Sequence, residues 1–583
     1  MSTAQAMNIA QARIVDLGAG PSADVLVRRA AGWPGLVCLQ GNWADSQALL
    51  TSHPVRLASS YAALADQQAV GGGAEADFVG GGWFGALAFD GTARLAFHDH
   101  VVRLVDGQWR FEALWHPSRA QQLNERLGAW QTLLARDDDA AAHWQAGEFA
   151  GRPWLDHLGG VERAIELIRA GELYQVNVCT RLTARFTGSE AAFFADLVTR
   201  LQPRFGAYLS GDVAVASMSP ELFLERRGRE VQTAPIKGTL PREPGDHNDA
   251  ALRRSAKDVA ENVMIVDLVR NDLGRVCEIG TVRPAGLLDV EAHPGVWHLV
   301  SRVCGRLRRD VTDADLLAAT FPPGSVTGAP KIRALAAIAD LEPDPRGTYT
   351  GAIGFASPTW GTQFSVAIRT FEIVGDRVQL GVGGGITADS VPMLEWRECL
   401  HKVAPLLAAA GSRPSSPMPD ADATLRAGGL LETILGVDGV PVRLADHLAR
   451  LDRSCRELFG AGLPPDAAER VTQAAKNVPV GRAVLRVTAS PGLDLTITAA
   501  PAPLRPSALN AVTRVRSAGL WRHKWADRTW TDDAGDVLFV GADGAVLETA
   551  RGNVFLIEDD GALVTPPLRD ELLPGVTRRA LLD

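Results

Sequence analysis

Short apolar runs separated by glycine and polar clusters characterise the first part of the chain, as in LVCLQ, VRLA and WFGALAF between residues 30 and 90. Runs of this length are typical of β-strands. Comparable runs recur at VAVASM, GTYTGAIGF, FSVAIRTFEI and RVQLGVGGGI. Because strands and helices mix without a strict β-α-β period, we predict an α+β fold with a large, mostly antiparallel sheet system.

Two segments of this first part have apolar residues at helical spacing and predict helices over 258–276 and 328–343. Their apolar stripes consist of Val259, Val263, Val266 and Leu273 in the first, and of Ile332, Leu335 and Ile338 in the second. In the second segment, Pro330 stands where a first helical turn tolerates proline.

A composition break follows these elements. Residues 410–428 are rich in proline, serine, alanine and aspartate and lack apolar periodicity, which is typical of a linker. We therefore predict a first domain over 1–408, a linker over 409–428 and a smaller domain over 429–583. In the last region, LADHLARLDRSCREL has the pattern of an amphipathic helix, and NVFLIEDDGALVT that of a hairpin with an Asp-Gly turn.

Composition and charge exclude several classes of function. The 583 residues include 59 Lys and Arg against 68 Asp and Glu, a formal charge of −9, so no nucleic-acid or anionic-membrane surface is expected. No uncharged apolar run of about 18 residues and no leader pattern occur, and we expect a cytoplasmic protein. The six cysteines are dispersed without a CxxC pair or a G-x-C-x-G elbow, which argues against disulfides, a zinc knuckle and a nucleophilic cysteine.

The most informative segment for chemistry is VQLGVGGGITADSVPMLEWRECLHKV. Glycines 383–385 end a strand-like run, and they let backbone N–H groups approach an anion. On the helix that follows, Glu395, Glu398 and Lys402 fall on one face. This pattern indicates a hard-metal and carboxylate site. The alternative is a solvated helix face with a Glu398–Lys402 pair.

Three further candidates stand in the first region. Lys237 lies in the tight segment TAPIKGTLPR, where a confined lysine becomes a nucleophile, although most single lysines are surface residues. Glu261 lies on an otherwise apolar helix, either as a metal ligand or on an exposed face. The loop FPPGSVTGAPK runs into a helix N-terminus and is a plausible anion seat.

Together these motifs resemble the chorismate-utilising enzymes over residues 1–408. The shared marks are YQVN, SPELF, PIKGT, KDVAENVMIVDLVRNDLGRV, HLVSRV, FPPGSVTGAPKIRAL, AIRT and the GGGITADS block with its two glutamates and lysine. The resemblance implies a large two-sheet antiparallel β core wrapped by helices that binds chorismate and Mg²⁺.

The resemblance also implies site residues. Glu261 and Glu398 look like the Mg²⁺ ligands. The groups that hold the two carboxylates of chorismate look like Gly238, Thr239, Tyr349, Arg369, Gly383, Gly384, Gly385 and Lys402. A dicarboxylate needs two cationic seats, which a bidentate arginine, a glycine-lined backbone and a metal supply.

Within that family, anthranilate synthases carry alanine in the PI-x-GT motif and aminodeoxychorismate synthases carry lysine, as at Lys237. The serine of GSVTGAPK also resembles the second branch. By this resemblance Lys237 is the nucleophile, Glu221 the general acid and His298 a supporting residue. We expect a raised pKa for Glu221, because protonation of a leaving group needs a neutral carboxyl. Because no cysteine fits a glutaminase elbow, ammonia is expected from a separate glutamine amidotransferase subunit.

The last region resembles fold-type IV pyridoxal phosphate enzymes, and among them aminodeoxychorismate lyases. Lys524 looks like the Schiff-base lysine and Glu548 like the partner of the pyridinium nitrogen. Arg450 and the backbone at Val576 and Thr577 look like phosphate contacts. The resemblance implies further strands after LPGVTR, so we expect a shortened lyase domain. The alternatives are an anthranilate synthase large subunit, and a last region that is a non-catalytic docking or dimerisation module.

Overall fold

The computed structural model divides the chain into two compact units. The first comprises 1–151, 164–388 and 398–415, and the second 152–163, 389–397 and 416–583. The structure describes residues 10–65, 70–71, 77–137, 142–151, 154–242, 252–253, 256–293, 296–342, 344–412, 429–459, 461–478, 481–490, 492–502, 511–515, 523–526, 536–540, 545–558, 560–568 and 572–582. Residues 413–428, most of the expected linker, lie outside this description.

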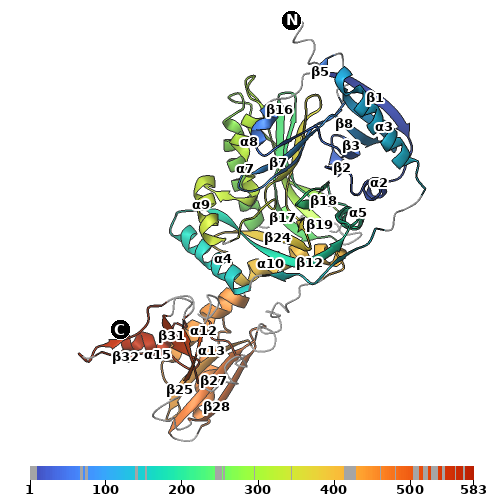
Figure 1. Cartoon of the computed structure of the whole chain (residues 1–583). Coiled ribbons are helices and arrows are strands. Elements are labelled where there is room, and N and C mark those ends of the chain that lie inside the picture. The colour runs from blue at the N-terminus through green and yellow to red at the C-terminus, as the bar shows by residue number, and fades with distance from the viewer. Residues whose placement is uncertain are drawn as a thin grey trace. The chain divides into compact units, whose positions relative to one another are not determined.

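The first unit is built on two large sheets, labelled in Figure 1. The 14-stranded sheet runs in the order β10 (Trp144–Ala146), β12 (Gln175–Gly188), β24 (Arg377–Ile386), β23 (Thr370–Val374), β14 (Ala214–Ser219), β13 (Phe205–Leu209), β2 (Val37–Trp43), β3 (Ser46–Thr51), β8 (His100–Val105), β9 (Gln108–Trp115), β1 (Ala10–Gly18) and β5 (Val70–Gly71), with β11 (Ala150–Gly151) and β20 (Gly328–Ala329) paired to β12. All its pairs are antiparallel except β1 with β5.

The second sheet has ten strands, in the order β17 (Ile236–Pro241), β19 (Val296–Arg306), β16 (Glu230–Ala234), β15 (Leu222–Arg227), β22 (Gly361–Val366), β21 (Ala352–Ser357), β6 (Gly82–Leu87), β7 (Ala93–His98) and β4 (Arg56–Ala58), with β18 (Arg283–His293) beside β19. The strand-like runs of the sequence therefore become strands of two antiparallel sheets. The predicted two-sheet α+β architecture is confirmed.

Aromatic and aliphatic side chains from both sheets form the core between them. Trp43 of β2 packs against Phe205 of β13, and its ring centroid lies 6.4 Å from that of Phe355 on β21. Phe84 of β6 stacks on Phe355 at 5.5 Å. Burial of rings this large is the main source of stability in such a core.

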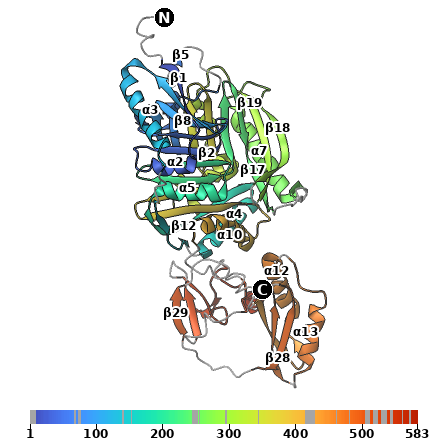
Figure 2. The same ribbon diagram turned by 90° about the vertical axis from the view of Figure 1, so that its right-hand side faces the viewer.

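Helices cover the outside of the sheets. On the first unit they are α2 (Ala23–Arg29), α3 (Ala120–Leu134), α5 (Glu190–Leu201), α7 (Ala256–Gly274), α8 (Asp313–Thr320) and α9 (Lys331–Leu341), with single 3₁₀ turns η1 (Tyr61–Ala65), η2 (Pro117–Arg119) and η3 (Gly324–Val326). Two more helices, α4 (Trp154–Arg169) and α10 (Pro392–Ala409), each have residues in both units. Local signals mark some starts: Ser189 caps α5, and Thr312 with Asp315 forms a capping box at α8. Figure 2 shows α7 beside β17 and β19, which it contacts.

Both predicted helices exist, but their buried faces differ from the predicted stripes. On α7 the buried residues are Asn262, Ile265, Val266, Val269, Asp272 and Leu273, whereas Val263 is 49% exposed. On α9 the buried residues are Ala334, Ala337 and Ile338, whereas Ile332 is 86% exposed. Small residues face the sheet because the helix backbone lies close to it, and hydrophobicity alone does not reveal this.

The second unit contains smaller sheets. One has the order β26 (Val440–Pro441), β25 (Leu430–Val437), β27 (Arg482–Ala489) and β28 (Leu495–Pro501), and α12 (Leu444–Phe459) and α13 (Ala467–Lys476) pack against it (Figure 2). The others join β29 (Ala511–Val515), β30 (Asp536–Val540) and β31 (Val546–Thr549), and β32 (Leu556–Ile557) with β33 (Leu563–Val564). A last helix, α15, covers Val576–Leu582. The predicted amphipathic helix and hairpin are confirmed.

Two expectations about the whole chain are also answered. The six cysteines are all free. Within the described ranges, none of the helices combines the length and the hydropathy that crossing a bilayer requires.

Candidate functional site

Lys237 lies in a β-bulge of strand β17. The pairing of β17 with β19 shifts between Ile236 and Thr239, which leaves Lys237 and Gly238 in the irregular stretch. Gly238 has φ +90°, where a side chain is strained, and a Cβ there would lie 3.1 Å from Cβ of Asp258. Because a bulge redirects the side chain of its strand, the local backbone aims Lys237 away from the regular ladder.

Acidic and basic groups surround the Lys237 ammonium. Its pKa is lowered, first by burial, which disfavours the charged form. The charges acting on it are those of Glu261, Lys402, Glu221 and Glu398. Five residues that the sequence singled out on four separate segments are therefore neighbours in the fold.

Strand β24 forms one wall beside this group. It continues to Ile386, so the three glycines belong to the ladder with β12, opposite Cys179, Val178 and Asn177, and not to a loop after the strand. A Cβ at Gly385 would lie 2.1 Å from Nε2 of Gln175 and 3.5 Å from Nζ of Lys237. Glycine at 385 therefore leaves the space that these two side chains use.

Lys402 connects helix α10 to strand β24. Its Nζ donates to the carbonyl oxygen of Gly383 at 3.0 Å and forms an ion pair with Glu398 at 2.7 Å. The Glu398–Lys402 pair that the alternative interpretation of a solvated helix face contains therefore exists. Glu395 differs from both: it is buried, and its Oε1 accepts a hydrogen bond from Oγ of Ser390 at 2.7 Å, before the helix start.

Glu261 and Glu398 are the carboxylates that fit a metal in this group. Glu261 is half-buried on α7, and its neighbour Asn262 ties that helix to β19 through Leu299 and Ser301. The side chain of Glu398 is 48% exposed. In the described part of the chain, no three histidine, cysteine or acidic side chains gather to hold a metal alone. Two carboxylates suit Mg²⁺, which keeps water and substrate oxygens among its ligands.

Glu221 connects the two sheets and is only 3% exposed. Its Oε1 accepts a hydrogen bond from Oγ of Ser325 at 2.6 Å. Burial raises the pKa of Glu221 to about 7, against the opposing effects of Ser325, the charge of Lys237 and the Ile236 N–H. The predicted rise in this pKa is confirmed. The contact with Ser325 is a role that the sequence reasoning did not assign.

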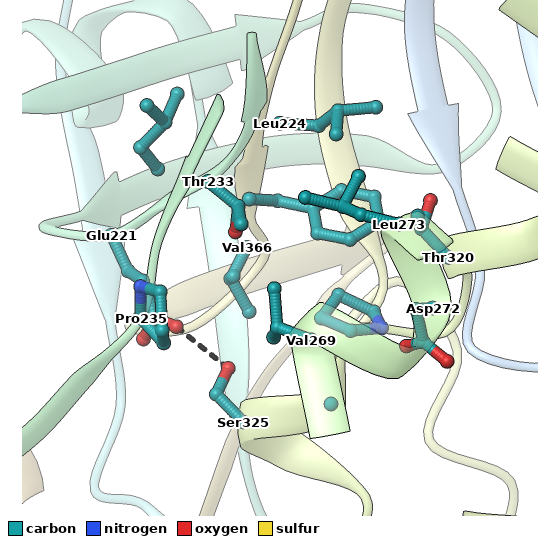
Figure 3. Close-up of a pocket in the computed structure, with 14 residues that line it drawn as sticks. Glu221, Leu224, Thr233, Pro235, Val269, Asp272, Leu273, Thr320, Ser325 and Val366 are labelled. Carbon is teal, nitrogen blue, oxygen red and sulfur yellow. Dashed lines mark hydrogen bonds between the residues drawn. The ribbon is translucent and has the colours of Figure 1, made fainter. Parts of the chain in front are cut away.

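Behind Glu221 lies a small cavity of about 20 Å³, bounded on the opposite side by Asp272 (Figure 3). Such a volume admits about one water molecule. Lys331 pairs with Asp272 and donates to the carbonyls of Thr320 and Pro322 at 2.9 Å each. These contacts of Lys331 therefore stabilise the conformation of the loop FPPGSVTGAPK, which also carries Ser325.

The charge of Arg369 acts on His298, which lies on the strand that pairs with the strand of Lys237. His298 stands opposite Thr239 on the neighbouring strand, and burial, followed by the charge of Arg369, lowers its pKa to about 3. Its imidazole is therefore neutral at physiological pH. Arg369 has φ +52° at the entry to β23, and burial lowers its pKa. The side chain of Thr239 lies outside the described residues.

Tyr349 packs against Gly381 of strand β24. Its ring lies over Gly381, where a Cβ would come within 2.2 Å of Cγ, and the side chain is buried. Burial raises its pKa well above the ordinary value. The ring of Tyr349 fills the space against β24, the strand that also contains Gly383, Gly384 and Gly385.

In the second unit, a chain of contacts joins the residues singled out there. Lys524 accepts a backbone hydrogen bond from Leu431 at 2.8 Å, next to Glu432. Glu432 accepts from Nε and Nη2 of Arg450, at 2.6 and 2.9 Å, and Nη1 of Arg450 donates to the carbonyl of Pro574 at 3.0 Å.

The same chain continues to Glu548. The Leu573 N–H and Nδ2 of Asn553 donate to Oε2 of Glu548 at 3.3 and 3.2 Å, and Glu548 is buried. Val576 and Thr577 follow directly as the first residues of α15. The backbone of Leu573 and Pro574 thus links Arg450 to the buried carboxylate of Glu548, and the charge of Lys524 acts on Glu432. A lysine, an arginine and a buried carboxylate are residue types that fit pyridoxal phosphate. Glu432 and its second partner His447 were missed, because an acid within a strand carries no local signal.

Two family models match separate parts of the chain. The model of chorismate binding enzymes matches residues 56–408, and that of class IV amino-transferases matches residues 429–583. The fold resembles the anthranilate synthase component I from Streptococcus pneumoniae, with a TM-score of 0.51 and 25% identity over 68% of this chain and 92% of that one. It also resembles the menaquinone-specific isochorismate synthase from Escherichia coli, with a TM-score of 0.56 and 21% identity over 69% and 95%.

Curated relatives come from two groups. The aminodeoxychorismate synthase component 1 of Klebsiella aerogenes is 45% identical over 241 residues, 40% of this chain and 53% of that protein. The anthranilate synthase component 1 of Thermus thermophilus is 42% identical over 258 residues, 43% and 56%. The chain thus spans about half the length of these relatives. With its match over 56–408, the chain belongs to the family of chorismate binding enzymes.

Proposed function

We propose that the first unit converts chorismate to 4-amino-4-deoxychorismate with ammonia and Mg²⁺. The observation that carries this proposal is the position of Lys237, half-buried in a bulge among Glu221, Glu261, Glu398 and Lys402. The two groups of relatives have nearly equal identities, so their names do not separate the two reactions. Lysine in the PI-x-GT motif, where anthranilate synthases have alanine, favours the amination at C4.

The chemistry that we assign to Lys237 and Glu221 follows from their protonation. Burial lowers the pKa of Lys237 and raises that of Glu221, so each side chain gains a larger neutral fraction. A neutral Lys237 Nζ adds to ring carbon 2 while both conjugated ring double bonds shift, and the C4 hydroxyl departs as water with the proton of Glu221. Ammonia then adds at C4, both double bonds shift back, and the bond from C2 to Nζ breaks. The new C4 ammonium returns one proton to the Glu221 carboxylate.

The remaining groups hold the substrate. Arg369 and Lys402 supply cationic seats for its two carboxylates, and Gly383, Gly384 and Gly385 allow it to approach the β24 backbone. Glu261 and Glu398 would hold Mg²⁺, which supplies positive charge beside a substrate carboxylate. His298, neutral because it is buried, supports Arg369 without adding to the charge.

The source of ammonia in this proposal is a separate glutamine amidotransferase. Burial raises the pKa of Cys38, Cys179, Cys277, Cys304 and Cys455, which keeps these thiols protonated and unreactive. None of them has the activated setting that a glutaminase nucleophile needs. We also propose a cytoplasmic location, where chorismate and ammonia are available.

For the second unit we propose the elimination of pyruvate from aminodeoxychorismate, which yields 4-aminobenzoate, a folate precursor. Lys524 would bind pyridoxal phosphate and move the α-proton, Glu548 would keep the pyridine nitrogen protonated, and Arg450 with the backbone of Val576 and Thr577 would hold the phosphate. The cofactor supplies an electron sink when bound. The match to class IV amino-transferases and the contacts from Lys524 to Glu548 support this assignment.

The test is product identification by chromatography and mass spectrometry. The full chain receives chorismate, Mg²⁺ and an ammonium salt, with and without pyridoxal phosphate. We expect aminodeoxychorismate in the mixture without pyridoxal phosphate and 4-aminobenzoate in the mixture that contains it. Anthranilate as the sole product would overturn the synthase assignment. Aminodeoxychorismate that persists with pyridoxal phosphate present would instead favour a docking module in the second unit.

A further inference from the structure

Glu432 is a buried carboxylate that the proposed chemistry of the second unit does not use. It lies on β25 with 1% of its surface exposed. Two N–H groups of Arg450 and Nδ1 of His447, at 2.8 Å, meet its two oxygens. Burial alone would raise its pKa, but the hydrogen bonds of His447 and Arg450, with the charges of Arg450 and Lys524, lower it to about 2. Glu432 is therefore ionised at any physiological pH.

The geometry of Arg450 shows what this carboxylate does. Nε and Nη2 grip Glu432 side-on, which fixes the plane of the guanidinium, and Nη1 binds the carbonyl of Pro574. A guanidinium has five N–H bonds, so among the described residues these three contacts leave two for a further acceptor. Pro574 precedes Val576 by two residues, which places the fixed guanidinium beside the backbone at the start of α15.

Glu432 can affect phosphate binding in two ways that have opposite signs. A carboxylate repels a phosphate, so if Glu432 acted only through its charge, it would weaken phosphate binding. If it acts by fixing the long arginine side chain, it strengthens binding, because an immobilised donor loses less conformational entropy when the ligand arrives. The two readings predict opposite signs for the same substitution.

We propose that Glu432 is a positioning residue that orients Arg450 to bind the phosphate of a phosphorylated aldehyde cofactor. This inference rests on the proposed function of the second unit, and it adds a role for a residue that contacts no ligand itself. His447 holds the second oxygen of Glu432 in place, and Lys524 is anchored on the backbone beside it.

The experiment compares pyridoxal phosphate with pyridoxal, which lacks only the phosphate. Equilibrium dialysis against the full chain gives the dissociation constant of pyridoxal divided by that of pyridoxal phosphate. Inorganic phosphate serves as a competitor. In the variant Glu432→Gln we expect this ratio, which measures the preference for the phosphate, to fall about tenfold, because the amide donates where Arg450 needs an acceptor. Glu469→Gln, an exposed change of equal charge on α13, should leave the ratio unchanged.

A second variant guards against a loss of folding. Glu432→Asp keeps the charge near Arg450 but retracts the carboxylate by one methylene, so we expect a similar fall with an unchanged circular dichroism spectrum. A ratio that stays constant or rises in both variants would overturn the proposal, as would a Glu432→Asp protein that is unfolded. If the unmodified chain itself shows no preference for pyridoxal phosphate, the proposed function of this unit fails instead.

Discussion

Ser325 donates a hydrogen bond to Glu221 across 2.6 Å, between residues that lie 104 positions apart in the chain. Both side chains are buried at the edge of a cavity that Asp272 closes on the other side (Figure 3). The hydrogen bond opposes the effect of burial on the pKa of Glu221. The loop that carries Ser325 therefore tunes the carboxyl to which we assign acid catalysis.

The variant Ser325→Ala should move the alkaline limb of the pH–rate profile to higher pH. Without the hydrogen bond that stabilises the ionised form, Glu221 keeps its proton further above pH 7. The measurement is kcat/KM for chorismate from pH 5 to 9 with saturating ammonia and Mg²⁺. Ser357→Ala removes a buried hydroxyl bonded to Val79 away from the site, and its limb should not move. A shift to lower pH would contradict the assignment.

The variant Glu221→Gln should lose about 10²- to 10⁴-fold in kcat, the usual contribution of a general acid. It should also change how stability depends on pH. A carboxyl whose pKa rises from 4.5 to about 7 on folding binds a proton in the native state, so it destabilises the wild type as pH increases through that window, by about 3 kcal/mol in total. The thermal midpoint of the variant relative to the wild type should therefore increase from pH 4.5 to 7. A difference in thermal midpoint that stays constant with pH would show that folding does not raise the pKa of Glu221.

Replacing Lys237 by alanine should abolish the formation of aminodeoxychorismate, because among the described residues Lys237 is the amine of the bulge beside Gly385. Product identification from chorismate, Mg²⁺ and ammonia provides the measurement. Lys476→Ala, on the exposed end of α13, is the matched control and should retain full activity. Aminodeoxychorismate formed by Lys237→Ala at the full rate would rule out a nucleophilic lysine.

The Mg²⁺ requirement should depend on Glu398. In Glu398→Gln one of two carboxylates is lost and Lys402 loses its ion pair, so the Mg²⁺ concentration for half-maximal rate should rise about tenfold or more. Titration of EDTA-treated enzyme with MgCl₂ measures this. The exposed Glu166 of α4 offers a control, since Glu166→Gln should leave the titration unaltered. If Glu398→Gln and the wild type gave the same Mg²⁺ titration, Glu398 would not be a metal ligand.

Treatment with pyridoxal phosphate and borohydride should attach the cofactor covalently at Lys524. Peptide mass spectrometry locates the attachment, and Lys524→Ala should show none at this segment. Lys524 is anchored to β25 through its backbone, so the substitution should leave the sheet intact. Labelling of other lysines in place of Lys524 would place the cofactor elsewhere.

Local patterns in the sequence carried much of this outcome. The spacing of apolar residues marked α12, the Asp-Gly turn marked the hairpin of β32 and β33, and Pro330 marked the start of α9. The motifs around Lys237, Glu261 and Glu398 named residues that the fold does bring together. Such signals succeed because helix periodicity, turn geometry and motif chemistry each depend on residues close together in the chain.

Tertiary structure decided what those signals could not. The exposure of Ile332 and the burial of Ala334 depend on how closely α9 approaches its sheet. The bulge at Lys237, the ladder of β24 with β12 and the contact of Ser325 with Glu221 all join distant segments. So does the grip of Glu432 on Arg450. Sequence alone therefore determined which groups are available and which elements carry them, whereas protonation and orientation awaited the fold, because burial and long-range partners set a pKa.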